Sequence, residues 1–324
     1  MKHFFGPFGA TLLAVAGCAV AFCQGNSGGQ PDVTFLEKIQ HRTNPNAPQQ
    51  APTAGSTGSI RPTIGYHGGK LVPLPDVYFI WYGNWNQGNG TDTPGGQQIL
   101  RDLIYGLSNS PYFKINTSFT TGPYSVSGTI NFTPSTNEYT VGGSNYSTSL
   151  SDSDILAIVG NSIGSGKLPY DANGVYFVLT SSDVDESSGF CSQYCGWHFW
   201  GNTTAGQYVR YSFVGNAARC LSACAIQTVG PNGNAGVDGM ASVVTHELEE
   251  VVTDADHTAW YNGPGSESAD MCAWTFGHSQ TQLASGAYYN MTLPASSTTT
   301  RHFEIQRQLS SGSKCYINWV TQAQ

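Results

Sequence analysis

The stretch Val237–Val252, read as "VDGMASVVTHELEEVV", decides how the chain can fold, because its apolar residues recur at the period of a helix. At 100° per residue, four apolar side chains share one stripe: Met240, Val244, Leu248 and Val251. The short carboxylate of Asp238 is suited to cap the first turn, so the helix is expected to begin there. His246 and Glu250 lie one turn apart on a neighbouring face. The stretch therefore predicts a long helix with a polar pair beside its apolar stripe.

The letters "HELEE" at His246–Glu250 contain the first half of a zinc-peptidase signature, His-Glu-x-x-His, with glutamate in the place of the second histidine. Two side chains at i and i+4 can reach one metal ion, so His246 and Glu250 are predicted metal ligands. Glu247 falls between this pair and the apolar stripe, within range of a water molecule activated by the ion. The spacing thus predicts a zincin-like active-site helix with Glu247 as the catalytic general base.

A third ligand is expected downstream of the helix. In one large group of zinc peptidases it is an acidic residue twenty positions after the second helix ligand, and here that position is Asp270. Asp256, ten positions after His246, and His257 beside it are the competing candidates. A histidine with two carboxylates is richer in oxygen than most zinc sites, so zinc is expected while manganese or another harder ion stays open.

The alternative interpretation of this helix is an exposed acidic face that binds nothing. Two features argue against it. Asp254 and Asp256 follow the helix directly, where the helix dipole disfavours anions, and Glu249 and Glu250 add negative charge nearby. A bound cation would relieve that repulsion, so the sequence favours a divalent metal site.

The composition excludes some partners. Charged residues make up 10% of the chain and the formal net charge is −8, without a cluster of Lys and Arg, so nucleic acid is not an expected partner. The abundance of Gly, Ser, Thr and Asn suits a secreted protein rich in turns.

The N-terminal segment predicts export. Residues 1–23 contain an early basic residue, an apolar run and small residues near the end, as signal peptides do. Lipid anchoring at Cys18 is the alternative, because "VAGC" resembles a bacterial lipoprotein box. Residues 24–60 are rich in Pro, Gly, Gln and Ser and predict a disordered linker, and 61–324 predict one folded domain without a membrane span. We therefore expect a protein outside the cytoplasm, extracellular or in a cell wall.

Six cysteines remain after the signal segment: Cys191, Cys195, Cys220, Cys224, Cys272 and Cys315. In an oxidising compartment this even number predicts up to three disulfides. Our preferred pairing links the 191/195 segment to the 220/224 segment and joins Cys272 to Cys315. The two Cys-x-x-x-Cys pairs leave a structural zinc site as the alternative.

The rest of the chain predicts an α+β fold, in which a mixed sheet is packed with helices. Val77–Trp85 and Gly174–Val184 predict strands, the second covered on both faces. Residues 95–113 carry the apolar period of a helix, and a further helix is expected after a cap at Ser151 or Asp152. The alternation over Tyr124–Tyr146 predicts antiparallel hairpins.

Several sequence blocks in one order resemble the EXORDIUM family, also called the phosphate-induced protein family. They include "YHGG" at Tyr66–Gly69, "VYFIWYGNW", "CSQYCGWHFW" at Cys191–Trp200, "PNGNAGVDGMASVVTHELEE" and "ADMC" at Ala269–Cys272. The resemblance implies a secreted protein of the kind found in plant cell walls and linked to growth control, without an established biochemical activity.

The resemblance also bears on the site. Family members resemble this chain at five positions: His246, Glu247, Glu250, Asp270 and Cys272. His67 and His198 lie in matching blocks, so either could supply a further imidazole. The segment "VVTDADH" departs from the family pattern, which places Asp256 and His257 in doubt as ligands.

Three functions follow as hypotheses. The first is a secreted metal-dependent hydrolase, like a metallopeptidase, that acts on a peptide through Glu247 and a metal held by His246, Glu250 and Asp270. The second is a non-catalytic extracellular protein that binds cell-wall polysaccharide, with sugars stacked on aromatic side chains such as Trp81, Trp85, Trp197 and Trp200. A glycosidase that uses two of the three carboxylates is a third option.

Overall fold

The computed structural model describes residues 63–143, 146–277 and 279–318. The expected signal peptide at 1–23, the lipid-anchor position Cys18 and the expected linker at 24–60 lie outside the described residues. All described residues fall within one compact unit, Asp32–Gln324.

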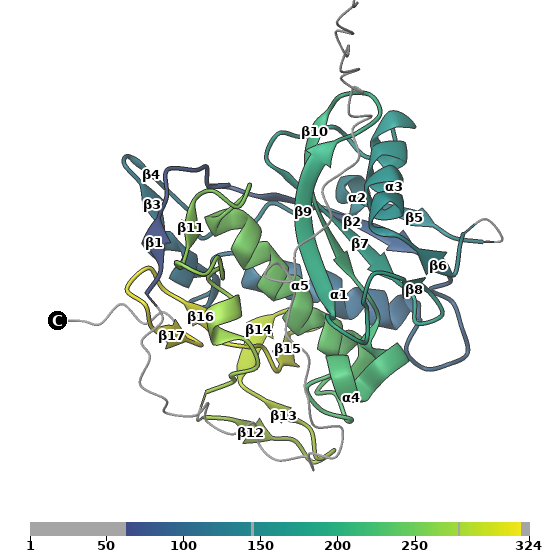
Figure 1. Cartoon of the computed structure of the whole chain (residues 1–324). Helices are drawn as coiled ribbons and strands as arrows, with labels where there is room; N and C mark the ends of the chain where they lie inside the picture. Colours follow the sequence, from purple (N-terminus) through teal and green to yellow (C-terminus); the bar gives the residue numbers. More distant parts are fainter. Residues whose placement is uncertain (1–62, 144–145, 278, 319–324) are drawn as a thin grey trace, which may run out of the picture. The chain divides into compact units, whose positions relative to one another are not determined.

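A five-stranded sheet forms the centre of the fold (Figure 1). Its order is β5 (Glu138–Val141), β2 (Asp76–Tyr82), β7 (Gly174–Thr180), β10 (Tyr208–Val214) and β9 (Gly196–Asn202). The first four strands are parallel, and β9 pairs antiparallel with β10 at the edge. Every residue of β7 is buried, as its continuous apolar run predicts for a strand covered on both faces.

Both long strands predicted from the sequence are confirmed, although they end a few residues earlier than expected. β2 ends at Tyr82 and β7 at Thr180. The chain then turns at Gly83, whose φ of 101° is open to glycine but not to most side chains. Polar residues follow both strand ends at the carboxyl edge of the sheet.

Helices cover both faces of this sheet. The helix α1 (Pro94–Leu107) lies in the connection from β2 to the edge strand β5. The helix α3 (Asp152–Gly164) lies in the return connection, which passes over β2 from β5 to β7. Because parallel crossovers are right-handed, connections in opposite directions place their helices on opposite faces, as Figure 1 also shows. The long helix α5 (Ala235–Thr253) packs beside α1 and against β9 and β10. The result is a mixed α/β arrangement, in which helices and strands alternate more than an α+β layout requires.

Local capping accounts for the helix starts. Thr93 accepts a hydrogen bond from the Gly96 amide at the start of α1, and Pro94 occupies the first turn. Ser151 and Asp154 form a reciprocal capping box at α3, so of the two candidates Ser151 is the cap.

The hairpins expected over Tyr124–Tyr146 are wrong in part. A short hairpin does form between β3 (Thr120–Thr121) and β4 (Tyr124–Ser125). The strand β5, however, joins β2 in parallel. Glu138 fixes it there, because its carboxylate accepts from Trp81 Nε1 at 3.0 Å and pairs with Arg101 at 2.7 Å. An alternating pattern suits a parallel edge strand as well as a hairpin strand, so sequence alternation cannot distinguish them.

Small two-stranded ladders and short helices complete the described chain. The ladders are β1 (Gly65–Tyr66) with β11 (Trp260–Tyr261), β6 (Ser149–Leu150) with β8 (Asp185–Glu186), β12 (Thr281–Gln282) with β13 (Tyr288–Tyr289), β14 (Met291–Pro294) with β15 (Thr300–Phe303), and β16 (Gln308–Leu309) with β17 (Cys315–Tyr316). The short helices are η2 (Phe113–Ser118), α2 (Pro134–Asn137), η3 (Ala217–Cys220), α4 (Leu221–Cys224) and η4 (Asp270–Cys272). The ladders after residue 280 bring the C-terminal part of the chain against α1 and η4.

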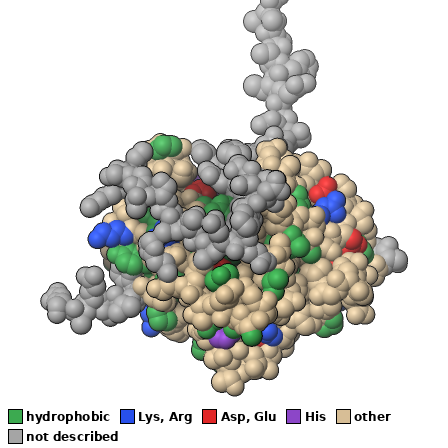
Figure 2. Space-filling model, turned by 90° about the horizontal axis from the view of Figure 1, so that it is seen from below, with side chains coloured by type: hydrophobic (Ala, Val, Ile, Leu, Met, Phe, Trp, Pro, Cys, Tyr) green, Lys and Arg blue, Asp and Glu red, His purple; other side chains and the backbone are tan. Residues whose placement is uncertain are grey.

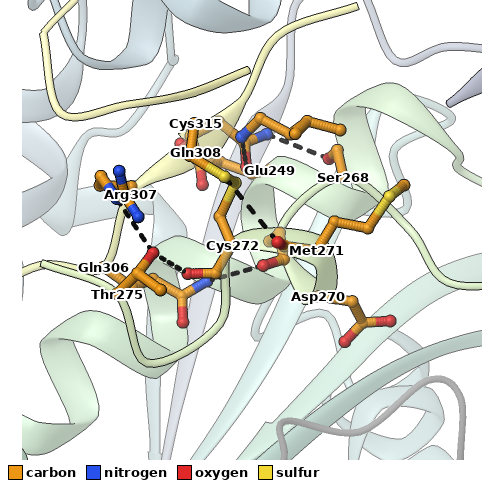
Figure 3. Close-up of a disulfide and its surroundings, with 12 residues drawn as sticks. Glu249, Ser268, Asp270, Met271, Cys272, Thr275, Gln306, Arg307, Gln308 and Cys315 are labelled. Atoms are coloured by element: carbon orange, nitrogen blue, oxygen red, sulfur yellow. Dashed lines mark hydrogen bonds between the residues drawn. A yellow bond between two sulfur atoms is a disulfide. The ribbon is translucent and has the colours of Figure 1, made fainter. Parts of the chain in front are cut away.

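Three disulfides link the described part of the chain, and the preferred pairing of segments is confirmed. They join Cys191 to Cys220, Cys195 to Cys224 and Cys272 to Cys315. The alternative zinc site in the two Cys-x-x-x-Cys pairs is therefore wrong, since all four thiols are oxidised. Figure 3 shows the third bond, which ties η4 to β17.

The surface carries few charges. On the face shown in Figure 2, Lys and Arg side chains stand apart from one another among uncharged residues. In the part of the chain that the structure describes, no helix is long and apolar enough to cross a membrane.

Candidate metal centre

The helix α5 begins earlier than the sequence suggested. Asn234 caps it by accepting a hydrogen bond from the Val237 amide, so the expected cap at Asp238 is wrong. Asp238 lies inside the first turn, and its carboxylate accepts from the amide of Asn232 at 3.0 Å. A carboxylate in this position is favourable at the positive end of the helix dipole.

The helix α5 is buried on all sides. Every residue from Gly236 to Thr253 is buried, and four ionisable side chains have no exposed surface: His246, Glu247, Glu249 and Glu250. The alternative of an exposed acidic face is therefore wrong. Buried charges are costly unless they are paired, hydrogen-bonded or bound to a metal, so each of these groups needs a partner.

The three predicted ligands lie together. Nε2 of His246 is 3.2 Å from Glu250 Oε1 and 3.6 Å from Asp270 Oδ1. The backbone amide of Asp270 donates to Glu250 Oε1 at 3.0 Å, which fixes η4 against the helix. The donor atoms of the three residues all lie within 4.8 Å of one another. For a tetrahedral ion with ligand bonds of about 2.0–2.2 Å, neighbouring donor atoms are about 3.3–3.6 Å apart, which these distances match.

The environment of this triad favours positive charge. Burial alone would lower the pKa of His246, but the carboxylates of Glu250 and Asp270 outweigh it and raise that pKa well above its usual range. Burial, and then the charge of Asp270, raise the pKa of Glu250 to about 7. Among the described residues, His246 Nε2 and Glu250 Oε2 have no hydrogen-bond partner. The triad therefore presents donor atoms that a cation would satisfy.

Gln306 orients the histidine and was not found from the sequence. Its side-chain amide lies 2.6 Å from Nδ1 of His246. A histidine that binds a metal through Nε2 donates a proton from Nδ1, so metal binding requires the amide oxygen of Gln306, and not its nitrogen, to face Nδ1 of His246. Gln306 comes from the segment between β15 and β16, sixty residues after His246, and no local pattern marks it.

Glu247, the predicted base, faces a histidine on the sheet. Its Oε2 is 3.1 Å from Nδ1 of His198 on β9, and Glu250 Oε2 is 3.5 Å from the same nitrogen. Burial lowers the pKa of His198 well below its usual value, which favours a neutral imidazole whose Nδ1 proton is donated to Glu247. Of the two histidines in the family blocks, His198 thus lies beside the triad.

The other candidate ligands do not lie beside His246. His67 is exposed, and its ring stacks on Tyr261 at 3.7 Å, away from the triad. Asp256 is wrong as a ligand, because it pairs with Arg210 at 2.9 Å and accepts from Tyr208. His257, the other competing candidate, lies beside His198 and not beside His246.

Comparisons with a family model and with curated proteins point to the same family. A family model described as the phosphate-induced protein 1 conserved region matches residues 64–306. Protein EXORDIUM-like 3 from Arabidopsis thaliana is 29% identical over 255 residues, which cover 69% of this chain and 72% of the relative. Protein EXORDIUM-like 5 from the same plant is 29% identical over 246 residues, 65% of this chain and 64% of the relative. No solved structure gives a significant match.

Proposed function

The chain belongs to the phosphate-induced protein 1 family, and we propose that it is a secreted, metal-dependent hydrolase that acts on peptides outside the cell. His246, Glu250 and Asp270 hold a divalent ion, which we take to be zinc. The observation that carries the proposal is the convergence of these three donor atoms on one buried point. The three disulfides support export, because such bonds persist in oxidising compartments.

The residues fit a divalent ion. One imidazole and two carboxylates are ligands that zinc and manganese both accept. Three protein ligands leave one position for a substrate or water, as catalytic sites require. A divalent ion held there would supply Lewis-acid chemistry.

Glu247 is the group that moves a proton in this proposal. Its carboxylate lies on the same turn as His246, and Nδ1 of His198 donates to one of its oxygens. That contact holds the side chain in one orientation. A buried carboxylate so placed can take a proton from the attacking nucleophile and return it to the leaving group.

Two variants separate the base from a ligand. Glu247→Gln is nearly isosteric, and its amide oxygen still accepts from His198, so we expect full metal content and loss of peptide hydrolysis by at least about 100-fold. His246→Ala should lose the metal as well as the activity. Metal content by elemental analysis and hydrolysis of a broad peptide library are measured on the same samples.

Glu249→Gln is the matched control. Glu249 is equally buried on the same helix, but its carboxylate accepts from Tyr112 and belongs to none of the groups of candidate metal donors. This variant should keep both metal and activity. If Glu247→Gln loses the metal, Glu247 is a ligand and the assigned roles are wrong.

A metal-loaded wild type that hydrolyses no peptide would instead favour a non-catalytic binding protein. The aromatic residues give that alternative little support, since Trp81, Trp85 and Trp197 are buried in the core. The glycosidase hypothesis requires two carboxylates that flank a sugar ring, about 5–9.5 Å apart. In this site the carboxylates share imidazole partners within 4.8 Å, which suits a common cation better.

A further inference from the structure

A second set of donor atoms lies on the other side of His198. Nε2 of His198 is 2.8 Å from Nε2 of His257. Oε2 of Glu267 is 3.5 Å from the first of these nitrogens and 3.4 Å from the second. The three residues come from β9, from the loop after α5 and from the segment before η4, and none of them belongs to the triad of His246.

The hydrogen bonding of His198 determines which of its nitrogens is free to bind. Its Nδ1 faces the carboxylates of Glu247 and Glu250. Carboxylates only accept, so Nδ1 carries the proton. Nε2 therefore presents a lone pair, and it points at the same place as Glu267 and His257. A histidine that donates one N–H to a carboxylate and offers the other nitrogen is the usual arrangement of a zinc ligand.

The surrounding residues hold His257 in this position. Its backbone has a φ of 51°, a left-handed conformation that few side chains other than Asn, Asp and His adopt. Its ring packs edge-on against Trp200 at 4.5 Å. The imidazole is only 16% exposed, while His198 and Glu267 are almost completely buried. The three donors thus lie together at the edge of the buried cluster, and the 2.8 Å between the two Nε2 atoms would have to open to about 3.3 Å around a tetrahedral zinc ion.

We propose that His198, His257 and Glu267 form a second zinc site, next to the site on His246 and independent of it. Two imidazoles and one carboxylate are a more typical zinc donor set than one imidazole and two carboxylates. The second site should therefore bind zinc more tightly than the first. Glu247 lies between the sites, because it accepts from Nδ1 of the histidine that binds the second ion.

The alternative explanation is a simple hydrogen bond, in which Nε2–H of His257 donates to Nε2 of His198. Such a bond would satisfy both rings without an ion. This alternative predicts a different number of zinc ions per chain, because replacement of Glu267 would then leave the zinc content unchanged.

Zinc content of chains purified without chelators, and of chains reloaded with zinc after dialysis, tests the proposal. We expect about two ions per chain in the wild type and about one in Glu267→Gln and in His257→Gln. Asp270→Asn should also hold about one, the ion of the second site. His67→Gln is the control for loss of an unrelated histidine and should keep two.

The outcomes separate this proposal from the proposed hydrolase. If Asp270→Asn keeps the wild-type content and Glu267→Gln loses one ion, the second site stands and the first fails. If Glu267→Gln and His257→Gln both keep the wild-type content, the second site is overturned whatever the first one does. Circular dichroism of each variant verifies that it is folded, and His257→Gln, at the more exposed ligand, serves if Glu267→Gln does not fold.

Discussion

Asp102 on α1 and Glu250 on α5 are both completely buried, but different kinds of atoms face their carboxylates. Asp102 accepts from the amides and hydroxyls of Ser296 and Ser297, from Gln98, and from Arg301 Nε at 2.6 Å. Glu250 accepts from one backbone amide and otherwise faces imidazole nitrogens and the carboxylate of Asp270.

The pKa values follow from this difference. Burial would raise the pKa of Asp102, but the Ser297, Arg301 and Ser296 donors outweigh it and lower that pKa below its usual range. Burial dominates at Glu250 and raises its pKa to about 7. The protein therefore stabilises the charge of Asp102 with its own hydrogen-bond donors, whereas few such donors face Glu250, which is where we propose that a cation binds. Burial of a carboxylate alone does not mark a metal site; the nature of its neighbours does.

The largest expected effect is the loss of stability when Asp102 is replaced. Asp102→Leu leaves the guanidinium of Arg301 and four serine donors without their acceptor, so the free energy of unfolding should fall by about 3–5 kcal/mol. Urea denaturation measures it. Asp185→Ala is the control, because its ion pair with Arg219 is more than one-third exposed and should contribute about 0–1 kcal/mol. Equal losses in the two variants would mean that the buried network contributes no more than a surface pair.

The next effect concerns the disulfide beside the triad. Cys272 and Asp270 belong to the same short helix, η4, and the side chain of Asp270 points away from the disulfide (Figure 3). Replacing Cys272 and Cys315 by alanine opens a loop with a sequence separation of 43, which should cost about 2–4 kcal/mol. Zinc affinity should also fall, because Asp270 loses its anchor.

Cys191 and Cys220 are the matched pair for this test. The bond between Cys195 and Cys224 closes nearly the same loop, so removal of Cys191–Cys220 should cost much less and leave zinc affinity unchanged. A greater loss of affinity in this control than in the Cys272 and Cys315 variant would contradict the anchoring role. Unfolding and zinc titration of both double variants decide between these results.

The smallest effect belongs to a third buried carboxylate, Glu186, which is stabilised in its protonated form. Burial raises its pKa from 4.5 to about 7, and Asp152 adds to the shift. The folded chain thus retains a proton that the unfolded chain releases between these values, so stability from this group is complete below pH 4.5 and is lost as the pH rises through 7. Glu186→Gln cannot ionise.

The unfolding free energy of Glu186→Gln relative to wild type should therefore increase by about 1–3 kcal/mol across that pH window. Urea denaturation of both proteins at a series of pH values measures the difference. A difference that stays constant across the window would show that folding does not raise the pKa of Glu186.

Local patterns were sufficient to predict much of this structure. Periodicity predicted the strands at Val77 and Gly174, and capping chemistry narrowed the start of the next helix to Ser151 or Asp152. The preferred pairing of cysteine segments is also confirmed, although the sequence did not distinguish Cys191–Cys220 from Cys191–Cys224. Asp270 was chosen as a candidate because its spacing from Glu250 matches a known metallopeptidase pattern, and it lies 3.6 Å from His246. These features depend on residues that are close in the sequence or separated by a fixed spacing, and both can be read from a single sequence.

The remaining features depend on contacts between distant segments. Nothing near Gln306 indicates that its amide lies on His246, and Glu267 becomes a candidate only when the chain after α5 folds back towards β9. Asp256 stayed a competing candidate in the sequence because its partner, Arg210, lies on β10, forty-six residues earlier. The complete burial of α5 was hidden as well, since its acidic residues are typical of an exposed helix face.

Diffraction at the zinc absorption edge, from crystals grown with zinc, tests the central claim most directly. We predict an anomalous peak at about 2.0–2.2 Å from Nε2 of His246 and from carboxylate oxygens of Glu250 and Asp270, with none beside Asp102. An absence of any peak at His246, with its Nε2 donating a hydrogen bond to Glu250 instead, would contradict the claim that these donor atoms hold a metal ion.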